Sequence, residues 1–271
     1  MTSDSVPIVA GLGHDVPVLE LRGVTRSFSS RTRTTVALDQ VNLAVYSGSS
    51  VGIVGESGAG KSTILKLLMG LDTPTSGEVR FRGQVVNRRD RAQMTEFRRA
   101  VQIVFQDPRS SLDPRMTVAR IIAEPLRSLG IPGNHRDRVR EVLALVGLDE
   151  SVENKYPAQF SGGQRQRIAI ARALAPSPSV LVADEPVSAL DVSVRSHIVD
   201  VLADLTDRLG VTLVMVSHDI AIVGQLCDRT VVLRHGRIEE EGETVRVLTK
   251  PQAQYTRTLL DAVPQMPGAL D

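Results

Sequence analysis

One short segment, Gly55-Glu-Ser-Gly-Ala-Gly-Lys-Ser62, limits the folds open to this sequence more than any other feature. It matches the pattern G-x-x-x-x-G-K-[ST] at every specified position. An apolar run over residues 51–54 precedes it and predicts a buried strand, while the helical pattern over residues 61–69 that follows stops at Gly70. A strand, a glycine-rich turn and a helix in this order predict a phosphate-binding loop in an α/β core.

The residue types of this loop suit phosphate groups. Its glycines let successive backbone N–H groups turn toward phosphate oxygens, and the helix N-terminus adds a positive partial charge. In this motif Lys61 reaches the β- and γ-phosphates of a nucleotide, and the Ser62 hydroxyl binds Mg²⁺. The alternative is a glycine-rich turn with a solvated lysine, which the agreement of motif and context disfavours.

A second apolar run, over residues 180–183, ends in the acids Asp184 and Glu185. Two carboxylates at the end of an apolar strand indicate that a positive group lies beside them. We expect Asp184 to hold Mg²⁺ through water and Glu185 to orient or deprotonate an attacking water. The alternative is a helix N-cap acid beside an exposed glutamate.

Composition narrows the class of protein. The chain has 271 residues, of which 42% are hydrophobic and 23% charged, and these values exclude a disordered chain and an integral membrane protein. The net charge of +1 gives no field that would attract nucleic acid. The single cysteine, Cys227, allows no internal disulfide and no iron–sulfur centre. Residues 1–15 lack the pattern of a signal peptide, and no window approaches the roughly 20 apolar residues of a membrane helix.

The order of predicted elements indicates a parallel sheet with helices on its faces, because strands and helices alternate in the second half. Residues 107–159 are predicted to be mainly helical, with interruptions at prolines that include Pro125, and the tail after Lys250 is expected to be an irregular extension. The predicted strands cover residues 18–21, 41–45, 51–54, 180–183, 211–216 and 231–233, with a hairpin over 79–81 and 85–86 and further helices over 192–209 and 220–227.

The run Phe160-Ser-Gly-Gly-Gln-Arg-Gln-Arg167 forms a capping box, with Ser161 as the cap and Gln164 three residues later, at the start of a helix over residues 165–175. The serine hydroxyl and the N–H groups of the two glycines make a second anion site. One nucleotide does not easily use two helix N-termini on opposite faces of one domain. We therefore expect a dimer in which each chain's second site caps the γ-phosphate bound by the other.

With this run, the sequence resembles the ATP-binding cassette family, the nucleotide-binding subunits of membrane transporters. The remaining motifs of that family follow in order: Gln106 for Mg²⁺ and coupling, Ser188-Ala-Leu-Asp191 for the dimer interface, and His218 for the γ-phosphate. Phe28 is the candidate aromatic for stacking on adenine. The resemblance implies a P-loop NTPase with a RecA-like parallel-sheet core, an antiparallel β subdomain and an α-helical signature subdomain.

The resemblance implies a set of site residues as well, with ATP and Mg²⁺ as cofactors. The catalytic residues are Glu185 and His218, and Mg²⁺ is held by Ser62, Gln106 and Asp184. The residues implied to bind ATP are Phe28, Gly55, Glu56, Ser57, Gly58, Ala59, Gly60, Lys61, Ser62, Thr63, Gln106, Ser161, Gly162, Gly163, Gln164 and Asp191. The predicted organisation is a leader over residues 1–16, an ATPase domain over 17–249 with its helical subdomain at about 107–168, and a C-terminal extension over 250–271.

Three longer runs, over residues 106–118, 185–194 and 251–260, resemble the ATPase subunits of oligopeptide, dipeptide and nickel importers. In the third run Ala253-Gln254 stands where that group usually carries His-Pro. The resemblance implies a peripheral protein at the cytoplasmic face of the cell membrane. Its implied partners are two integral membrane permease subunits, a second cassette ATPase as homodimer or heterodimer, and an extracytoplasmic solute-binding protein, but no nucleic acid.

Other functions remain open at this point. Peptides are the favoured cargo, with nickel, a metallophore or another small solute as the alternative. A soluble cassette ATPase of DNA repair or translation would generally need a coiled-coil insertion, a zinc module or two tandem cassettes, which this chain lacks. A regulatory module that binds ATP without hydrolysing it is disfavoured by the presence of both Glu185 and His218.

Overall fold

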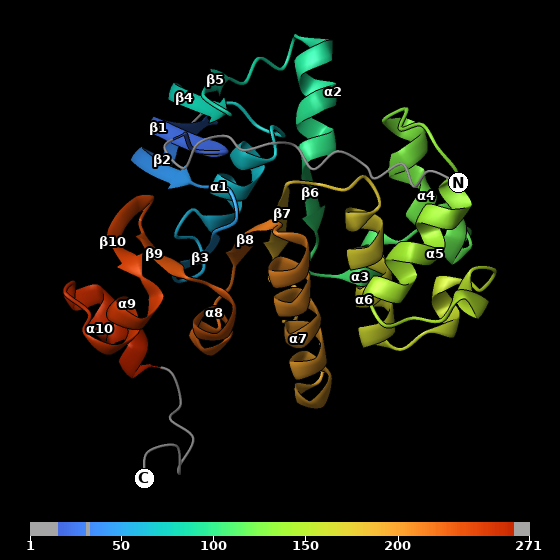
Figure 1. Ribbon diagram of the computed structural model, residues 1–271. Helices are drawn as coiled ribbons and strands as arrows, with labels where there is room; N and C mark the ends of the chain where they lie inside the picture. Colours follow the sequence, from blue (N-terminus) through green and yellow to red (C-terminus); the bar gives the residue numbers. More distant parts are fainter. Residues whose placement is uncertain (1–15, 31–32, 263–271) are drawn as a thin grey trace.

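The computed structural model describes residues 16–30 and 33–262 (Figure 1). Apart from Val16, the predicted leader over residues 1–16 lies outside these ranges, as do residues 263–271 of the predicted extension. Within the described ranges, no helix combines the length and the apolar character needed to span a membrane.

A six-stranded sheet with the order β10-β9-β3-β8-β7-β6 forms the centre of the fold. Its first five strands in chain order run parallel, whereas β10 pairs with β9 in the antiparallel direction. Parallel pairing brings the carboxyl ends of β3, β7 and β8 to one edge of the sheet, the place where α/β folds bind ligands. The strands are β3 (Ser50–Val54), β6 (Val101–Val104), β7 (Val180–Asp184), β8 (Thr212–Val216), β9 (Arg229–Arg234) and β10 (Arg237–Glu243).

A second, antiparallel sheet with the order β2-β1-β4-β5 lies beside the central sheet (Figure 1). Its strands are β1 (Leu19–Ser29), β2 (Thr34–Val45), β4 (Ser76–Phe81) and β5 (Gln84–Val85). The β1–β2 pair runs from Leu19 opposite Val45 to Ser29 opposite Thr34, so both strands extend beyond the apolar runs that predicted them. The predicted α/β class with an antiparallel β region is confirmed.

Helices cover both faces of the central sheet. Helices α4, α5 and α6 pack on one another, on the opposite side of the molecule from the antiparallel sheet (Figure 1). Pro125 lies inside α4 and does not end it, whereas Pro108 is the first residue of α3. The helices are α1 (Lys61–Leu68), α2 (Arg91–Ala100), α3 (Pro108–Ser111), α4 (Val118–Ser128), α5 (His135–Leu145), α6 (Gly162–Leu174), α7 (Val192–Leu209), α8 (Ile220–Leu226), α9 (Thr244–Thr249) and α10 (Gln254–Asp261), with the 3-10 turns η1 (Glu150–Val152) and η2 (Pro157–Gln159).

The central sheet separates two hydrophobic cores. Successive side chains of a strand point to opposite faces, so Leu181 and Ala183 of β7 enter the core with the helices α4 to α8. Val180 and Val182 of the same strand enter the core shared with α1, α2 and the antiparallel sheet. Both faces of β7 are therefore buried, which agrees with its continuous apolar sequence. Packing on both sides holds the strand in place, and with it the acids at its carboxyl end.

The tail after Lys250 differs from the expectation. Residues Gln254–Asp261 form the helix α10, so the predicted irregular extension is wrong for this part. Two of the helix's side chains, Tyr255 and Thr256, are buried, and Tyr255 joins the core of the α-helical side. Contacts with distant residues thus order a segment whose own sequence gave little helical signal.

Candidate nucleotide-binding site

Three strand ends meet around a cavity of about 390 Å³ at the carboxyl edge of the central sheet. The phosphate loop follows β3, Asp184 ends β7, and His218 lies two residues after β8. The cavity is lined by Ala37, Ser57, Gly58, Gly60, Lys61, Ser62, Thr63, Gln106, Asp184, Glu185, Val216 and His218.

A positive φ and a close backbone contact together require glycine at two positions of the phosphate loop, Gly55 and Gly60. Gly55 has φ +155°, and a Cβ there would lie 2.2 Å from the Leu233 carbonyl oxygen. Gly60 has φ +112°, and its Cβ would lie 2.6 Å from the Ala37 carbonyl oxygen. Gly60 is the N-cap of α1 and offers no capping side chain, so the start of this helix presents its backbone N–H groups to a ligand.

Lys61 is folded back onto the loop. Its Nζ donates hydrogen bonds to the carbonyl oxygens of Gly55 at 2.5 Å and Glu56 at 2.9 Å. Burial lowers the pKa of Lys61, while the carboxylates of Glu185, Asp184 and Glu56 act in the opposite direction. The Nζ atom is hydrogen-bonded to two neutral carbonyl oxygens and not to a carboxylate, and this suits the side chain to an anion at the same place.

The two acids after β7 occupy different environments. Burial, together with the neighbouring Glu185 carboxylate, raises the pKa of Asp184, and Lys61 and Lys66 partly offset this effect. Glu185 has the backbone angle φ +44°, and its N–H donates to the Val216 carbonyl oxygen at 2.9 Å. A left-handed non-glycine residue costs on the order of 1–3 kcal/mol and persists only where its surroundings fix it. Here the hydrogen bond across to β8 holds it in place.

Two further side chains converge on the Glu185 carboxylate. The Gln106 Nε2 atom donates to Glu185 Oε2 at 3.2 Å, and His218 Nδ1 lies 3.1 Å from the same oxygen. The side chain of Glu185 is 18% exposed and that of His218 is 62% exposed. The Glu185 carboxylate therefore lines the cavity, keeps some exposure to solvent, and is contacted by both Gln106 and His218.

The cavity offers oxygen ligands that fit Mg²⁺. Among the described residues, no group of three or more His, Cys, Asp and Glu side chains could hold a metal by itself. Mg²⁺ needs no such group, because it is usually bound through one or two carboxylates, water and substrate phosphates. Ser62, Gln106 and Asp184 all line the cavity and supply one hydroxyl, one amide and one carboxylate.

The other predicted residues do not line this cavity. Ser161 caps α6 as expected: its Oγ accepts from the Gln164 N–H at 3.3 Å, and Gln164 Oε1 accepts from the Ser161 N–H at 3.0 Å. Gly163 packs closely on α7, since a Cβ there would lie 2.3 Å from Val194 Cγ1. Asp191 is the exposed N-cap of α7.

Phe28, the predicted adenine-stacking residue, lies in β1 opposite Thr35 and is 44% exposed. The guanidinium carbon of Arg26 lies 4.4 Å from the centroid of the Phe28 ring, so a cation covers one side of it. Its role stays a prediction.

Two residues that line the cavity were not predicted from the sequence, Ala37 and Val216. Val216 ends a predicted strand, and its position two residues before the expected histidine was an available signal. Ala37 carries no such signal, because it reaches the site through contacts that are distant in sequence: its carbonyl oxygen lies against Gly60 and Gly236.

A family model described as ABC transporter matches residues 38–188 of the chain. The chain is 44% identical over 252 residues to a putative peptide import ATP-binding protein of Brucella ovis, covering 92% of this chain and 80% of that protein. The chain belongs to the ABC transporter family. Its membership confirms the predicted cassette fold and makes it an ATPase of that family.

Further ABC proteins are similar to this chain in sequence or in structure. The oligopeptide transport ATP-binding protein OppF of Lactococcus lactis is 43% identical over 241 residues, covering 88% of this chain and 76% of that protein. The dimeric structure of the ATP-binding cassette MJ0796 in a post-hydrolysis state, bound to ADP and Pi, has a TM-score of 0.75 at 36% identity and covers 83% of this chain and 98% of that chain. The cbiO1 subunit of the transporter complex cbiONQ from Clostridium perfringens has a TM-score of 0.76 at 29% identity, over 87% of this chain and 92% of that chain.

Proposed function

We propose that this chain is the ATP-hydrolysing subunit of a peptide importer, held at the cytoplasmic face of the cell membrane by two integral membrane permease subunits. The observation that carries the enzymatic part is the meeting of Gln106 and His218 on the Glu185 carboxylate beside the phosphate loop. The cargo rests on relatives whose names state peptide import and oligopeptide transport. An extracytoplasmic solute-binding protein would deliver the peptide to the permeases.

ATP binding uses groups that line the cavity. The phosphates lie along the N–H groups at the start of α1, and Lys61 turns from the carbonyls of Gly55 and Glu56 toward them. Phe28, which does not line the cavity, stacks on the adenine ring in this proposal. Mg²⁺, when bound, neutralises charge on the phosphates, and Ser62, Gln106 and Asp184 are the residues that hold it.

Hydrolysis depends on the fixed carboxylate. Glu185 orients a water molecule toward the γ-phosphate and takes a proton from it, while His218 contacts the γ-phosphate. The hydrogen bond from Gln106 and the close approach of His218 Nδ1 hold Glu185 Oε2 in position. Such positioning contributes about 10²–10⁴ in rate.

The signature residues act from a second cassette. Ser161 and Gln164 are exposed and lie away from the cavity of their own chain, so they are free to close on the γ-phosphate bound by a partner. Asp191, exposed at the start of α7, faces the same interface in this proposal. The dimeric state of a solved relative supports this arrangement. ATP closes the dimer and hydrolysis reopens it.

Uptake of a labelled peptide tests the cargo. Host cells without this chain should lose uptake of an oligopeptide, and the unaltered chain should restore it while Lys61→Ala should not. Nickel uptake, measured in the same cells, should be unchanged. Loss of nickel uptake with normal peptide uptake would contradict the peptide assignment and leave the ATPase assignment in place.

A further inference from the structure

The last helix reaches the phosphate loop. The Glu56 N–H donates a hydrogen bond to the Tyr255 hydroxyl oxygen at 3.3 Å, across 199 positions of sequence. Tyr255 is only 7% exposed, and the Arg234 guanidinium lies 4.6 Å from its ring centroid. The end of β9, the helix α10 and the first turn of the loop therefore meet at one tyrosine.

The contact acts on a single peptide unit. The Glu56 N–H and the Gly55 carbonyl belong to the same planar amide, whose two polar groups point in opposite directions. Tyr255 binds the N–H, and Lys61 Nζ binds the carbonyl oxygen at 2.5 Å. Fixing the N–H toward the tyrosine also fixes the direction of the carbonyl, so the hydroxyl can keep the loop's first peptide in the same orientation when Lys61 turns from this carbonyl to the phosphates.

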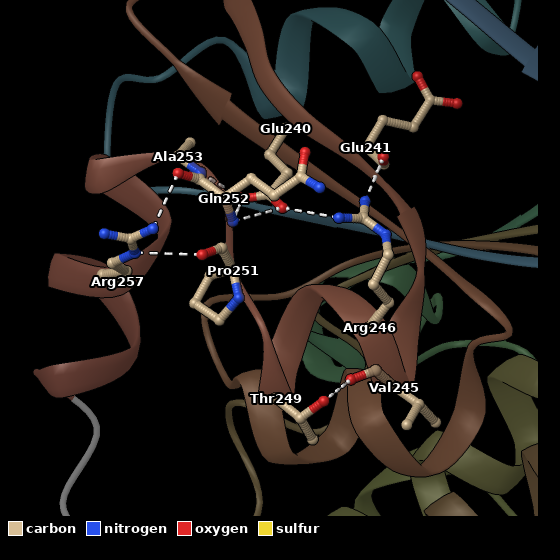
Figure 2. Close-up of polar contacts among 9 residues, drawn as sticks. All are labelled: Glu240, Glu241, Val245, Arg246, Thr249, Pro251, Gln252, Ala253 and Arg257. Atoms are coloured by element: carbon tan, nitrogen blue, oxygen red, sulfur yellow. Dashed lines mark hydrogen bonds and ion pairs between the residues drawn. The ribbon is translucent and has the colours of Figure 1, made fainter.

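The segment before α10 is itself tied to the sheet by Glu240 of β10 (Figure 2). The buried Glu240 carboxylate accepts hydrogen bonds from the N–H groups of Gln252, at 3.0 Å, and Ala253, at 3.0 Å. Arg246 donates to the same carboxylate at 3.2 Å. These contacts place the first turn of α10, and with it Tyr255.

A side chain of α10 also binds the backbone just before the helix. The guanidinium of Arg257 donates to the carbonyl oxygen of Pro251 at 3.1 Å and to that of Gln252 at 3.3 Å (Figure 2). Burial raises the pKa of Glu240, but the hydrogen bonds from Gln252, Ala253 and Arg246 outweigh this effect and hold the pKa below its usual value. The carboxylate is therefore ionised at neutral pH, as the three donors require.

We propose that the C-terminal extension braces the phosphate loop, with Tyr255 as a positioning residue that orients the Gly55–Glu56 peptide for nucleotide binding. The inference rests on the proposed binding of ATP at this loop and not on the identity of the cargo. A loop held in its binding shape loses less conformational freedom when the phosphates arrive, and the affinity for ATP is higher for that reason.

The substitution Tyr255→Phe removes the hydroxyl and keeps the buried ring. One net intramolecular hydrogen bond corresponds to an increase of about 3- to 10-fold in the dissociation constant and the KM for ATP. The value of kcat at saturating ATP should stay the same, because Glu185 and its two partners are untouched. Tyr46→Phe removes the same group from an exposed tyrosine and should change neither constant.

Amide hydrogen exchange, measured without nucleotide, tests the hydrogen bond between the Glu56 N–H and the Tyr255 hydroxyl directly. The Glu56 amide should exchange faster in Tyr255→Phe than in the unaltered full chain, while the melting temperature should fall by about 2–4 °C at most, the shift expected for one hydrogen bond in a chain of this size. Glu240→Gln provides a second variant that touches no loop residue, and it should increase KM in the same direction. An unchanged Glu56 exchange rate, or an unchanged KM in Tyr255→Phe, would refute the proposal that the extension braces the loop.

The two proposals fail in different ways. If the unaltered chain did not bind ATP in the presence of Mg²⁺, the proposed function would be refuted. The proposed effect of Tyr255 on ATP affinity would then be refuted as well. If the unaltered chain bound ATP and Tyr255→Phe bound it equally well, only the brace would be refuted. A lowered melting temperature with an unchanged KM would show that Tyr255 is a core residue alone, which also refutes it.

Discussion

Replacing Glu185 by glutamine tests the chemistry of the site. Glu185 Oε2 is bonded by Gln106 Nε2 at 3.2 Å and lies 3.1 Å from His218 Nδ1. A glutamine keeps one carbonyl oxygen in the same place, so Glu185→Gln should preserve this geometry and remove only the charge and the basicity. Loss of a general base lowers the rate by about 10²–10⁴, equivalent to about 3–5 kcal/mol of activation free energy.

The affinity of Glu185→Gln for ATP should not fall, although its turnover rate should. The Glu185 carboxylate raises the pKa of Asp184 and adds negative charge beside the place where the phosphates bind. Removing one negative charge should leave the affinity for ATP unchanged or increase it, because like charges at short range repel.

The assay measures phosphate release under saturating ATP and ATP binding by titration, both with the purified chain. Glu239→Gln makes the same chemical change at an exposed carboxylate of β10 and should behave as the unaltered chain does. Turnover within about 3-fold of the unaltered rate would remove Glu185 from its role. A parallel loss of ATP affinity would refute the claim that the substitution acts on the chemical step alone.

Three further results are expected. Gly55→Ala should abolish nucleotide binding in a titration, because its Cβ would lie 2.2 Å from the Leu233 carbonyl oxygen; normal affinity would contradict the close approach of loop and strand. Because the folded pKa of Glu240 is lowered, its carboxylate stabilises the tail above the unfolded pKa of about 4.3, and this is lost as the pH falls through the folded pKa. Proteolysis of residues 250–262 should therefore accelerate in acid, with a weaker pH dependence in Glu240→Gln; equal pH profiles would refute the anchor. If the chain homodimerises, a Ser161→Ala protein mixed with a Lys61→Ala protein should regain part of the ATPase activity that each lacks alone, whereas a mixture as inactive as its components would count against a homodimer.

The elements around the site could be predicted from the sequence because local patterns specify them. The strands β3, β7 and β8 are continuous apolar runs buried on both faces, and the phosphate loop follows the first of them at once. Their parallel order places the loop, Asp184 and His218 together without knowledge of any side-chain contact. The resemblance to the cassette family added Gln106, which no periodicity of the sequence indicates.

Elements that depend on distant contacts could not be predicted in this way. Helix α2 is strongly polar and buries only Met94, Phe97 and Ala100. Phe97 packs edge-on against Phe81 of β4, with ring centroids 5.2 Å apart. Helix α10 likewise depends on Glu240 of β10 and on a hydrogen bond to the phosphate loop. Sequence periodicity within a segment does not contain such partners.

The hydrogen bond from Gln106 to the Glu185 carboxylate could not be predicted from the sequence either. Gln106 lies 79 positions before Glu185, and the two meet only because β6 and β7 are neighbours in the sheet. The positive φ of Glu185 is a second feature of this kind, because no residue type at that position indicates it.

Isolation of the tagged chain from solubilised membranes of its host tests the central claim most directly, with the co-purifying proteins identified by mass spectrometry. The account predicts two polytopic permease subunits and a cassette ATPase partner, which is either a second copy of this chain or a related subunit. Ribosomes or DNA-repair proteins in the absence of any permease would contradict the transporter assignment while leaving the ATPase chemistry in place.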